Sequence, residues 1–272
     1  MSTSLRQAAI GVLLTADADA KAQAARDLQL RWVAGDIDRQ GEDPDMPPRP
    51  ARPASPQLLS PGAMPKRGRA GSPRARFALL HALAHIELNA VDLAIDMAGR
   101  WGAQMPPAFT DDWLRIADEE AQHFALLQEL LRASGGRYGD LPAHDGLWES
   151  AVATADDLAA RLAIVPMVLE ARGLDVTPAM IERFESMGDD AAAAVLKRIL
   201  IDEITHVEAG NRWFRKLCAD SLTEPRDRFR ELVNRYFKGP VKPPFNDSAR
   251  LRAGLTTDWY MGLGTAVPAS KR

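Results

Sequence analysis

The 272-residue sequence predicts an all-α fold in which two helix hairpins form a four-helix bundle. Aromatic residues make up only 6% of the chain and runs of β-branched residues are few, whereas β-strands are usually rich in both. Long segments also repeat apolar residues at helical spacing, the first of them through Leu80, Leu83 and Ile86. With 46% hydrophobic residues, a chain of this length can bury a large core in one domain with extensions.

We divide the chain into four segments. Residues 1–40 are expected to form an N-terminal helical segment of one or two amphipathic helices. Residues 41–73 contain nine of the 19 prolines, which excludes a continuous helix or strand, so we expect a Pro-rich strap that packs in extended form. A disordered linker is the alternative for this segment. Residues 74–219 form the bundle, and residues 220–272 form a C-terminal helix and a docking tail.

The helices are predicted from apolar periodicity and from start and stop signals. We expect helices at about 74–100, 112–133, 147–172, 178–187, 189–218 and 224–237. Thr110 is the expected N-cap of the second helix, and Gly135 should end it.

The third of these helices carries a proline. Pro166 should kink it one turn before Glu170 and free a backbone carbonyl there. Gly173 is the expected C-cap, and Thr177 followed by Pro178 should open the short helix after it.

Two short motifs point to metal chemistry. Glu120 and His123 are three residues apart, and so are Glu203 and His206. Residues three apart lie on one face of a helix, so each pair can reach one point in space. Glu-x-x-His is the spacing used by helix bundles that hold two metal ions.

Two further glutamates complete the pattern. Glu87 and Glu170 lie in otherwise apolar helical stretches, where a carboxylate is costly unless it is paired or binds a metal. Each precedes its Glu-x-x-His glutamate by 33 residues, and one shift of 83 residues maps the first set of three onto the second. One Glu from each of two helices, and Glu-x-x-His from each of the other two, is the ligand inventory of a di-iron bundle. Surface ion pairs on amphipathic helices are the alternative.

The six predicted ligands are four carboxylates and two imidazoles: Glu87, Glu120, His123, Glu170, Glu203 and His206. Such a set without a thiolate favours iron or manganese, so we expect two iron ions, with manganese as an alternative in one or both positions. The single cysteine, Cys218, excludes an intramolecular disulfide and a multi-cysteine metal site. Glu119 and Asp202 precede the motif glutamates and are candidates to accept a hydrogen bond from a ligand imidazole; solvent-facing acids are the alternative.

Other candidates carry weaker signals. His81 and His85 are four residues apart but lie well round the helix from Glu87, so we expect hydrogen-bonding or surface roles for both. Remaining residues considered for metal binding or electron transfer are His144, Glu208, Tyr138, Trp101 and Trp213, for which loop, surface or core positions are expected.

Charge gives little direction towards a macromolecular partner. The formal net charge is -3, which does not favour nucleic acid or membrane binding overall. Basic residues between Arg49 and Arg76 lack acidic neighbours and could contact RNA, but solvated or intramolecularly paired arginines are the commoner outcome. The apolar stretch at residues 7–14 is too short and too weakly flanked for a signal peptide, and no apolar run reaches the ~20 residues of a membrane span. We therefore expect a cytoplasmic protein.

Several stretches together resemble a known family. They are Leu80–Ala94 around Glu87, Asp118–Phe124, Asp202–Val207 and the tail segment Lys242–Asn246. On these residues the chain resembles the bacterial ferritin-like proteins grouped as domain of unknown function 455, over nearly its whole length. The resemblance implies a ferritin-like fold and a dinuclear site at the six residues named above, and no established substrate. More distantly, the arrangement is similar to ferritin-like tRNA hydroxylases and to rubrerythrin-type peroxidases.

The preferred functional hypothesis is an oxidoreductase that activates dioxygen at a di-iron centre and hydroxylates an organic substrate. Its partners would be a small-molecule substrate, dioxygen or peroxide, and an electron-donor protein. The alternatives are a rubrerythrin-like peroxidase or iron-oxidising protein, and a non-catalytic metal-bound helical adaptor. The sequence predicts neither the substrate nor the oligomeric state.

Overall fold

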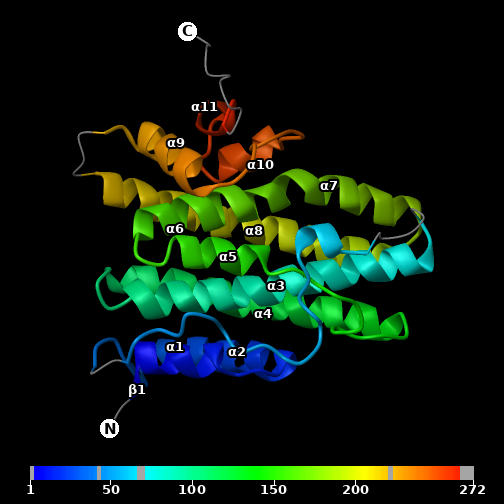
Figure 1. The fold of residues 1–272 in the computed structure, drawn as a ribbon, viewed down its shortest axis with the longest axis horizontal. Coiled ribbons are helices and arrows are strands. Elements are labelled where there is room, and N and C mark those ends of the chain that lie inside the picture. The colour runs from blue at the N-terminus through cyan, green and yellow to red at the C-terminus, as the bar shows by residue number, and fades with distance from the viewer. Residues whose placement is uncertain (1–2, 42–43, 66–70, 220–222, 264–272) are drawn as a thin grey trace. The chain divides into compact units, whose positions relative to one another are not determined.

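The computed structural model describes residues 3–41, 44–65, 71–219 and 223–263. These residues are mostly helical, which confirms the predicted all-α class. The strands among them are β1 (Thr3–Ser4) and β2 (Ile37–Asp38), which pair in parallel. The chain divides into two compact units, Met1–Glu149 and Ser150–Arg272 (Figure 1).

The first unit is built on a helix hairpin. Its two long helices are α3 (Pro73–Trp101) and α4 (Pro107–Ala133), which pack along each other. Helix α1 (Leu5–Leu13) packs against α3, and α2 (Ala18–Val33) packs against α4 (Figure 1). Of the one or two N-terminal helices expected, two are present, and they cover the hairpin.

The ends of the hairpin helices follow from local sequence, with one correction. Ser72 caps α3 by accepting a hydrogen bond from the Ala75 amide. Helix α4 begins at Pro107 and not near residue 112. The prediction of Thr110 as the N-cap is therefore wrong, because Thr110 is a buried residue inside the helix. Pro107 suits the first turn because its missing N–H would have no helical acceptor there. Gly135, with φ of 82°, ends the helix as predicted.

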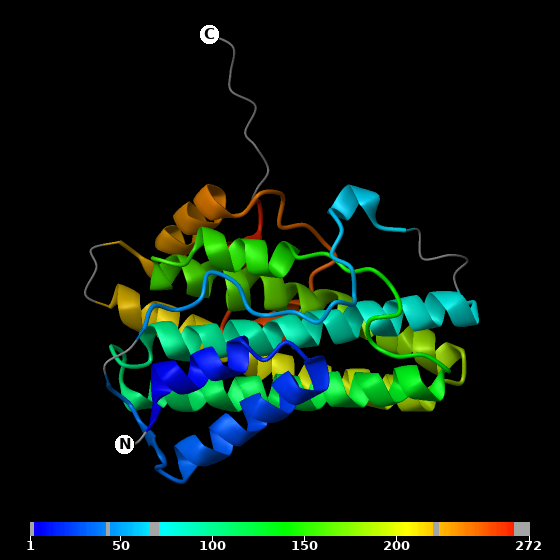
Figure 2. The same cartoon turned by 60° about the horizontal axis from the view of Figure 1, so that its bottom comes forward.

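The described part of the Pro-rich strap, residues 44–65, runs along the first unit (Figure 2). The Ala51 amide donates to the Leu13 carbonyl at 2.9 Å, and the Trp148 indole N–H donates to the Pro48 carbonyl at 3.1 Å. Near its end the strap forms the 3-10 turn η1 (Pro61–Ala63). These contacts hold the extended part of the strap against the helices, although its prolines prevent a long helix or strand.

A buried ion-pair network joins the strap, α2 and α3. Lys21 Nζ lies 2.7 Å from Asp92 Oδ1, and Arg52 Nη1 lies 2.6 Å from Asp92 Oδ2. Lys21 also donates to the Ala51 carbonyl, and Arg52 donates to Asn89 Oδ1. Burial raises the pKa of Asp92, while the charges of Arg52 and Lys21 act to lower it. No pattern in the sequence predicted this network.

Removing one member of the network should destabilise the first unit strongly. We expect Lys21→Met to lower the free energy of unfolding by about 3–5 kcal/mol, because it leaves the fully buried Asp92 with less compensating charge. Urea unfolding followed by circular dichroism measures the change. Arg31→Gln, an exposed change on the same helix, is the control and should alter stability by less than about 0.5 kcal/mol. A loss for Lys21→Met no larger than that of the control would contradict the interpretation.

The loop after α4 is held by an imidazole. His81 Nε2 accepts hydrogen bonds from the Gly139 amide at 2.9 Å and the Leu141 amide at 3.4 Å. Only an unprotonated Nε2 can accept them, and burial lowers the pKa of His81. His85 is similarly engaged, with Nδ1 2.8 Å from the Tyr138 hydroxyl and Nε2 3.0 Å from the His144 carbonyl. Both histidines therefore have the hydrogen-bonding role predicted for them.

The lowered pKa of His81 predicts a pH-dependent stability. The unfolded state takes up a proton on His81 near its ordinary pKa of 6.5, whereas the folded state resists it, so stability falls as pH drops below about 6.5. We expect His81→Gln, which does not titrate, to lose less stability than the wild type between pH 7.5 and pH 5. Urea midpoints at both pH values measure this. Equal losses in both proteins would exclude the assigned role.

The second unit is also built on a helix hairpin. Helix α7 (Ala171–Ser186) packs against α8 (Asp190–Cys218). Before α7, the chain forms α6 (Leu158–Ile164) and then η2 (Val165–Glu170), a π-helical segment that continues directly into α7. Helix α5 (Gly146–Ala153) precedes them.

The helix boundaries in this region differ from the prediction. The expected helix at 147–172 is interrupted before α6, where Asp157 caps a new helix by accepting from the Ala160 amide. Gly173 is not a C-cap, and Thr177 and Pro178 do not open a helix, because α7 runs through all three to Ser186. Gly188, with φ of 70°, follows the true end.

The tail packs on this second hairpin through charged and polar contacts. Arg250 donates to both carboxylate oxygens of Asp175 at 2.8 and 2.7 Å, and the Asn246 amide donates to Asp175 Oδ1. Arg172 donates to the carbonyls of Lys242 and Pro244. The elements of this tail are α9 (Pro225–Tyr236), α10 (Asp247–Arg252) and α11 (Thr257–Tyr260).

By length and mean hydropathy alone, α3 also passes the test for a membrane span, since one 18-residue window has a mean hydropathy of 1.4. However, 72% of that window is buried inside the protein, and it is interrupted by Glu87, Asn89 and Asp92. These features are those of a core helix in a soluble protein.

Candidate metal centre

The first half of the candidate site lies where α3 faces α4. Glu120 and His123 stand one turn apart on α4, and Glu87 projects from α3. His123 Nδ1 lies 3.3 Å from Glu87 Oε2 and 3.3 Å from Glu120 Oε2. One potential ligand atom from each of the three residues lies within 4.8 Å of the others, and all three side chains are buried. The predicted convergence of Glu87, Glu120 and His123 is therefore present in the structure.

The buried surroundings of this half-site disfavour the ionised forms of its two carboxyl groups when no cation is present. Burial raises the pKa of Glu87 well above its ordinary value, and the nearby Glu120 carboxylate raises it further, while His123 acts in the opposite direction. Two carboxylates so close together in a buried place need either a proton or a cation between them.

The contrast with the other acids of α3 is informative. Asp92 is paired with Lys21 and Arg52, and Asp96 with Arg100 at 2.8 Å. Among the described residues, Glu87 has His123 as its ion-pair partner and no lysine or arginine. The fold thus provides basic side chains for two of the three buried acids of this helix and leaves the third facing carboxylate and imidazole groups.

The second half of the candidate site repeats these elements. Glu203 and His206 lie one turn apart on α8, with His206 Nδ1 3.7 Å from Glu203 Oε2, and both are buried. Glu170 is the last residue of η2, which packs against α8, and its side chain is half-buried. A π-helical turn adds a residue per turn relative to the α-helix and often occurs at functional sites. Pro166 lies in this π-helical segment, and the kink and free carbonyl predicted there stay predictions.

A glycine on α8 makes room for this turn. A Cβ atom at Gly210 would lie 2.4 Å from Pro166 Cγ and 2.5 Å from Pro166 Cβ, so no larger residue fits without displacing η2. Because Glu170 ends the same segment, Gly210 helps to fix the position of this predicted ligand.

We expect Gly210→Ala to lower the free energy of unfolding by roughly 1–3 kcal/mol, because the added methyl group forces α8 and η2 apart. Gly173→Ala is the matched control: a Cβ there meets nothing within 4 Å, and alanine favours the helix by up to about 1 kcal/mol. Urea unfolding of both variants measures the difference. Similar stability changes in the two variants would contradict the close approach at Pro166.

The acids before the two motif glutamates contact arginines. Glu119 accepts a hydrogen bond from Arg115, and Asp202 Oδ2 lies 3.6 Å from Arg198 Nε, each pair spanning one helical turn. Their hydrogen bonds to ligand imidazoles stay a prediction. Glu208 pairs with the exposed Arg212, in agreement with its expected place on another face of the helix.

The aromatic candidates lie in packed surroundings. Tyr138 stacks on His81 and His85 and is buried, so it belongs to the loop network described above. Trp213 and Trp101 are buried as well, as expected for core residues. His144 has an exposed side chain.

Arginines of the strap are engaged within the first unit. Arg49 forms an ion pair with Asp145, and Arg52 pairs with Asp92. Arg76, which lies in α3 just after the strap, donates to the Ser134 hydroxyl. Of the other basic residues between Arg49 and Arg76, Arg74 is exposed, and Lys66, Arg67 and Arg69 lie outside the described residues. RNA contact by the strap therefore stays a prediction, with two of its arginines neutralised by acids.

Comparison with known proteins gives a family without an assigned activity. A family model described as "Protein of unknown function (DUF455)" matches residues 14–261. A curated relative from Haemophilus influenzae, described as "Uncharacterized protein", is 44% identical over 222 residues, which cover 77% of this chain and 75% of the relative. No solved structure matches the chain.

Proposed function

The chain belongs to the DUF455 family, and we propose that its two helix hairpins form a ferritin-like four-helix bundle that holds two iron ions and activates dioxygen. Glu87, Glu120 and His123 would supply one half of the ligand set. Glu170, Glu203 and His206 would supply the other half. Manganese in one or both positions is the variant of this proposal that the same ligands allow.

The observation that carries the proposal is the buried acid cluster of the first half-site. Glu87 and Glu120 are 3% and 0% exposed, and His123 beside them is 0% exposed. A metal cation is the group that best compensates two buried carboxylates next to an imidazole. Lysine and arginine do this for Asp92 and Asp96 on the same helix, so the fold has basic residues available yet places none at Glu87.

The repeat of the ligand pattern supports two ions and not one. Each hairpin offers a lone glutamate on its first element and a Glu-x-x-His pair on its second, with the same separations in sequence. Bundles with this inventory hold two iron or manganese ions by such residues. The proposal that the two halves act together rests on this repeat.

The ligand chemistry indicates the reaction class. Iron held by carboxylates and imidazoles, with coordination positions left open, supplies redox chemistry with dioxygen or peroxide. The contribution of the chain is to bury the site, to fix each imidazole one turn from its glutamate, and to exclude water around them. We favour oxidation of an organic substrate, for which the electrons would come from a separate donor protein.

Metal content tests the ligand set. We expect about two iron ions per chain in wild-type protein reconstituted anaerobically with ferrous iron. Glu120→Gln and Glu203→Gln change one carboxylate in each half and keep side-chain size, so each should bind markedly less iron. Elemental analysis after desalting measures the ratio, with circular dichroism as a check on folding.

Glu208→Gln is the matched control, since Glu208 is exposed on the same helix as Glu203 and should leave the iron content unchanged. An iron content of one or zero in the wild type would contradict the dinuclear proposal. A folded Glu120→Gln variant with full iron content would remove that residue from the ligand set.

Reactivity tests the proposed reaction class. We expect chemically reduced, iron-loaded wild-type protein to consume dioxygen at least about tenfold faster than Glu120→Gln, because the variant lacks an intact centre. An oxygen electrode and the optical spectrum after mixing follow the reaction. Iron-loaded protein that stays reduced in air would contradict dioxygen activation, and fast turnover with peroxide alone would favour the peroxidase alternative.

A further inference from the structure

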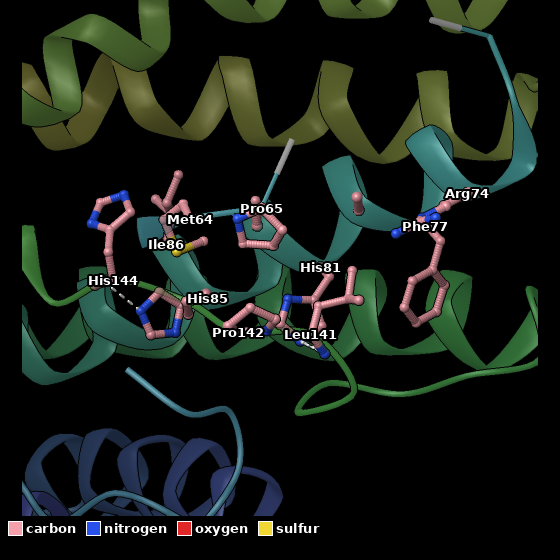
Figure 3. Close-up of a pocket in the computed structure, with 13 residues that line it drawn as sticks. Met64, Pro65, Arg74, Phe77, His81, His85, Ile86, Leu141, Pro142 and His144 are labelled. Carbon is pink, nitrogen blue, oxygen red and sulfur yellow. Dashed lines mark hydrogen bonds between the residues drawn. The ribbon is translucent and has the colours of Figure 1, made fainter. Parts of the chain in front are cut away.

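The first unit contains a cavity of about 360 Å³ that is separate from the candidate metal ligands. Its walls come from the end of the strap, from the N-terminal half of α3 and from the loop after α4 (Figure 3). The α3 residues that line it are Arg74, Phe77, Ala78, His81, Ala82, His85 and Ile86. Glu87 comes two residues after His85, which places it about 200° further round the helix, on the opposite side.

Most of the cavity wall is apolar. Phe77 and Leu141 are half-buried, and Ile86 is 44% exposed. Met64, Pro65 and Pro142 add further apolar surface. Because this surface faces solvent, a ligand with an apolar body would gain free energy by covering it.

The cavity wall has few polar groups, and they differ in whether they can still bind a ligand. The imidazoles of His81 and His85 already make hydrogen bonds, so they act as fixed wall groups. Arg74 is exposed and has no ion-pair partner among the described residues. Figure 3 shows Arg74 at one end of the row of lining residues and His144 at the other.

The charge of the wall selects the kind of ligand. Among the described residues that line the cavity there is no aspartate or glutamate, and the guanidinium of Arg74 is their permanent charge. Arg74 also lies in the first turn of α3, where the helix dipole favours an anion. A carboxylate bound to arginine forms a charge-assisted and often bidentate hydrogen bond.

We propose that this cavity binds a medium-chain aliphatic carboxylate, with the carboxylate at Arg74 and the chain against Phe77, Ala82 and Ile86. One water molecule, with its single non-hydrogen atom, occupies roughly 30 Å³ in the liquid. A cavity of about 360 Å³ therefore has room for about a dozen non-hydrogen atoms, which is the size of decanoate. The proposal uses only residues of the first unit and does not depend on the proposed metal centre.

Calorimetric titration with decanoate, below its micellar concentration, tests the proposal. We expect saturable binding to the wild type, at least about tenfold weaker binding to Arg74→Gln, and still weaker binding to Arg74→Glu. Decan-1-ol has the same chain without the charge, so it should bind the wild type more weakly than decanoate does. Its affinity should be the same for the wild type and both Arg74 variants. Arg31→Gln, an exposed arginine change on α2, is the control and should bind decanoate as the wild type does.

A second variant tests the apolar part of the site. Ala82→Phe should fill the cavity and abolish binding of both decanoate and decan-1-ol, and Ala78→Leu serves the same purpose if the first variant is unstable. Absence of decanoate binding to the wild type would overturn the proposal. Equal decanoate affinity in the wild type and Arg74→Glu would overturn it too, because the contact would then be non-specific.

Discussion

Burial of acidic side chains on α3 is the constraint on which much of the first unit depends. Asp92 and Asp96 are fully buried, and a buried carboxylate is tolerated only when a cation or several hydrogen bonds compensate it. Lys21 and Arg52 reach Asp92 from α2 and from the strap, so this requirement ties both segments to the hairpin. The extended Pro-rich strap is thereby fixed by ion pairs as well as by backbone hydrogen bonds.

The need to compensate a buried acid also applies on the opposite side of α3, at Glu87. Glu87 is as buried as the other acids, yet the groups around it are a second carboxylate and an imidazole. The buried acids of α3 thus have basic partners on one side of the helix and potential metal ligands as partners on the other. One side holds the N-terminal helices and the strap, and the other provides the proposed half-site. The cavity beside Arg74 uses the first of these sides, towards its N-terminal end.

Sequence reasoning was most successful where the relevant distances are short along the chain. Glu120 and His123 could be paired because residues three apart share a helix face, and Glu87 was found because a charge interrupts an apolar stretch. The partners of Asp92 could not be found this way, since Lys21 is 71 residues away and no periodicity links them. Local stop signals also failed at Gly173 and Pro178, where packing of α7 on α8 outweighs weak helix propensity.

Anomalous diffraction at the iron absorption edge, from crystals of iron-loaded protein, tests the central claim most directly. We expect two strong anomalous peaks per chain, one of them in contact with Glu87, Glu120 and His123. The other should contact Glu203 and His206. Peaks absent from these residues, in crystals whose fluorescence shows bound iron, would contradict the assignment of the buried acid cluster as a metal centre.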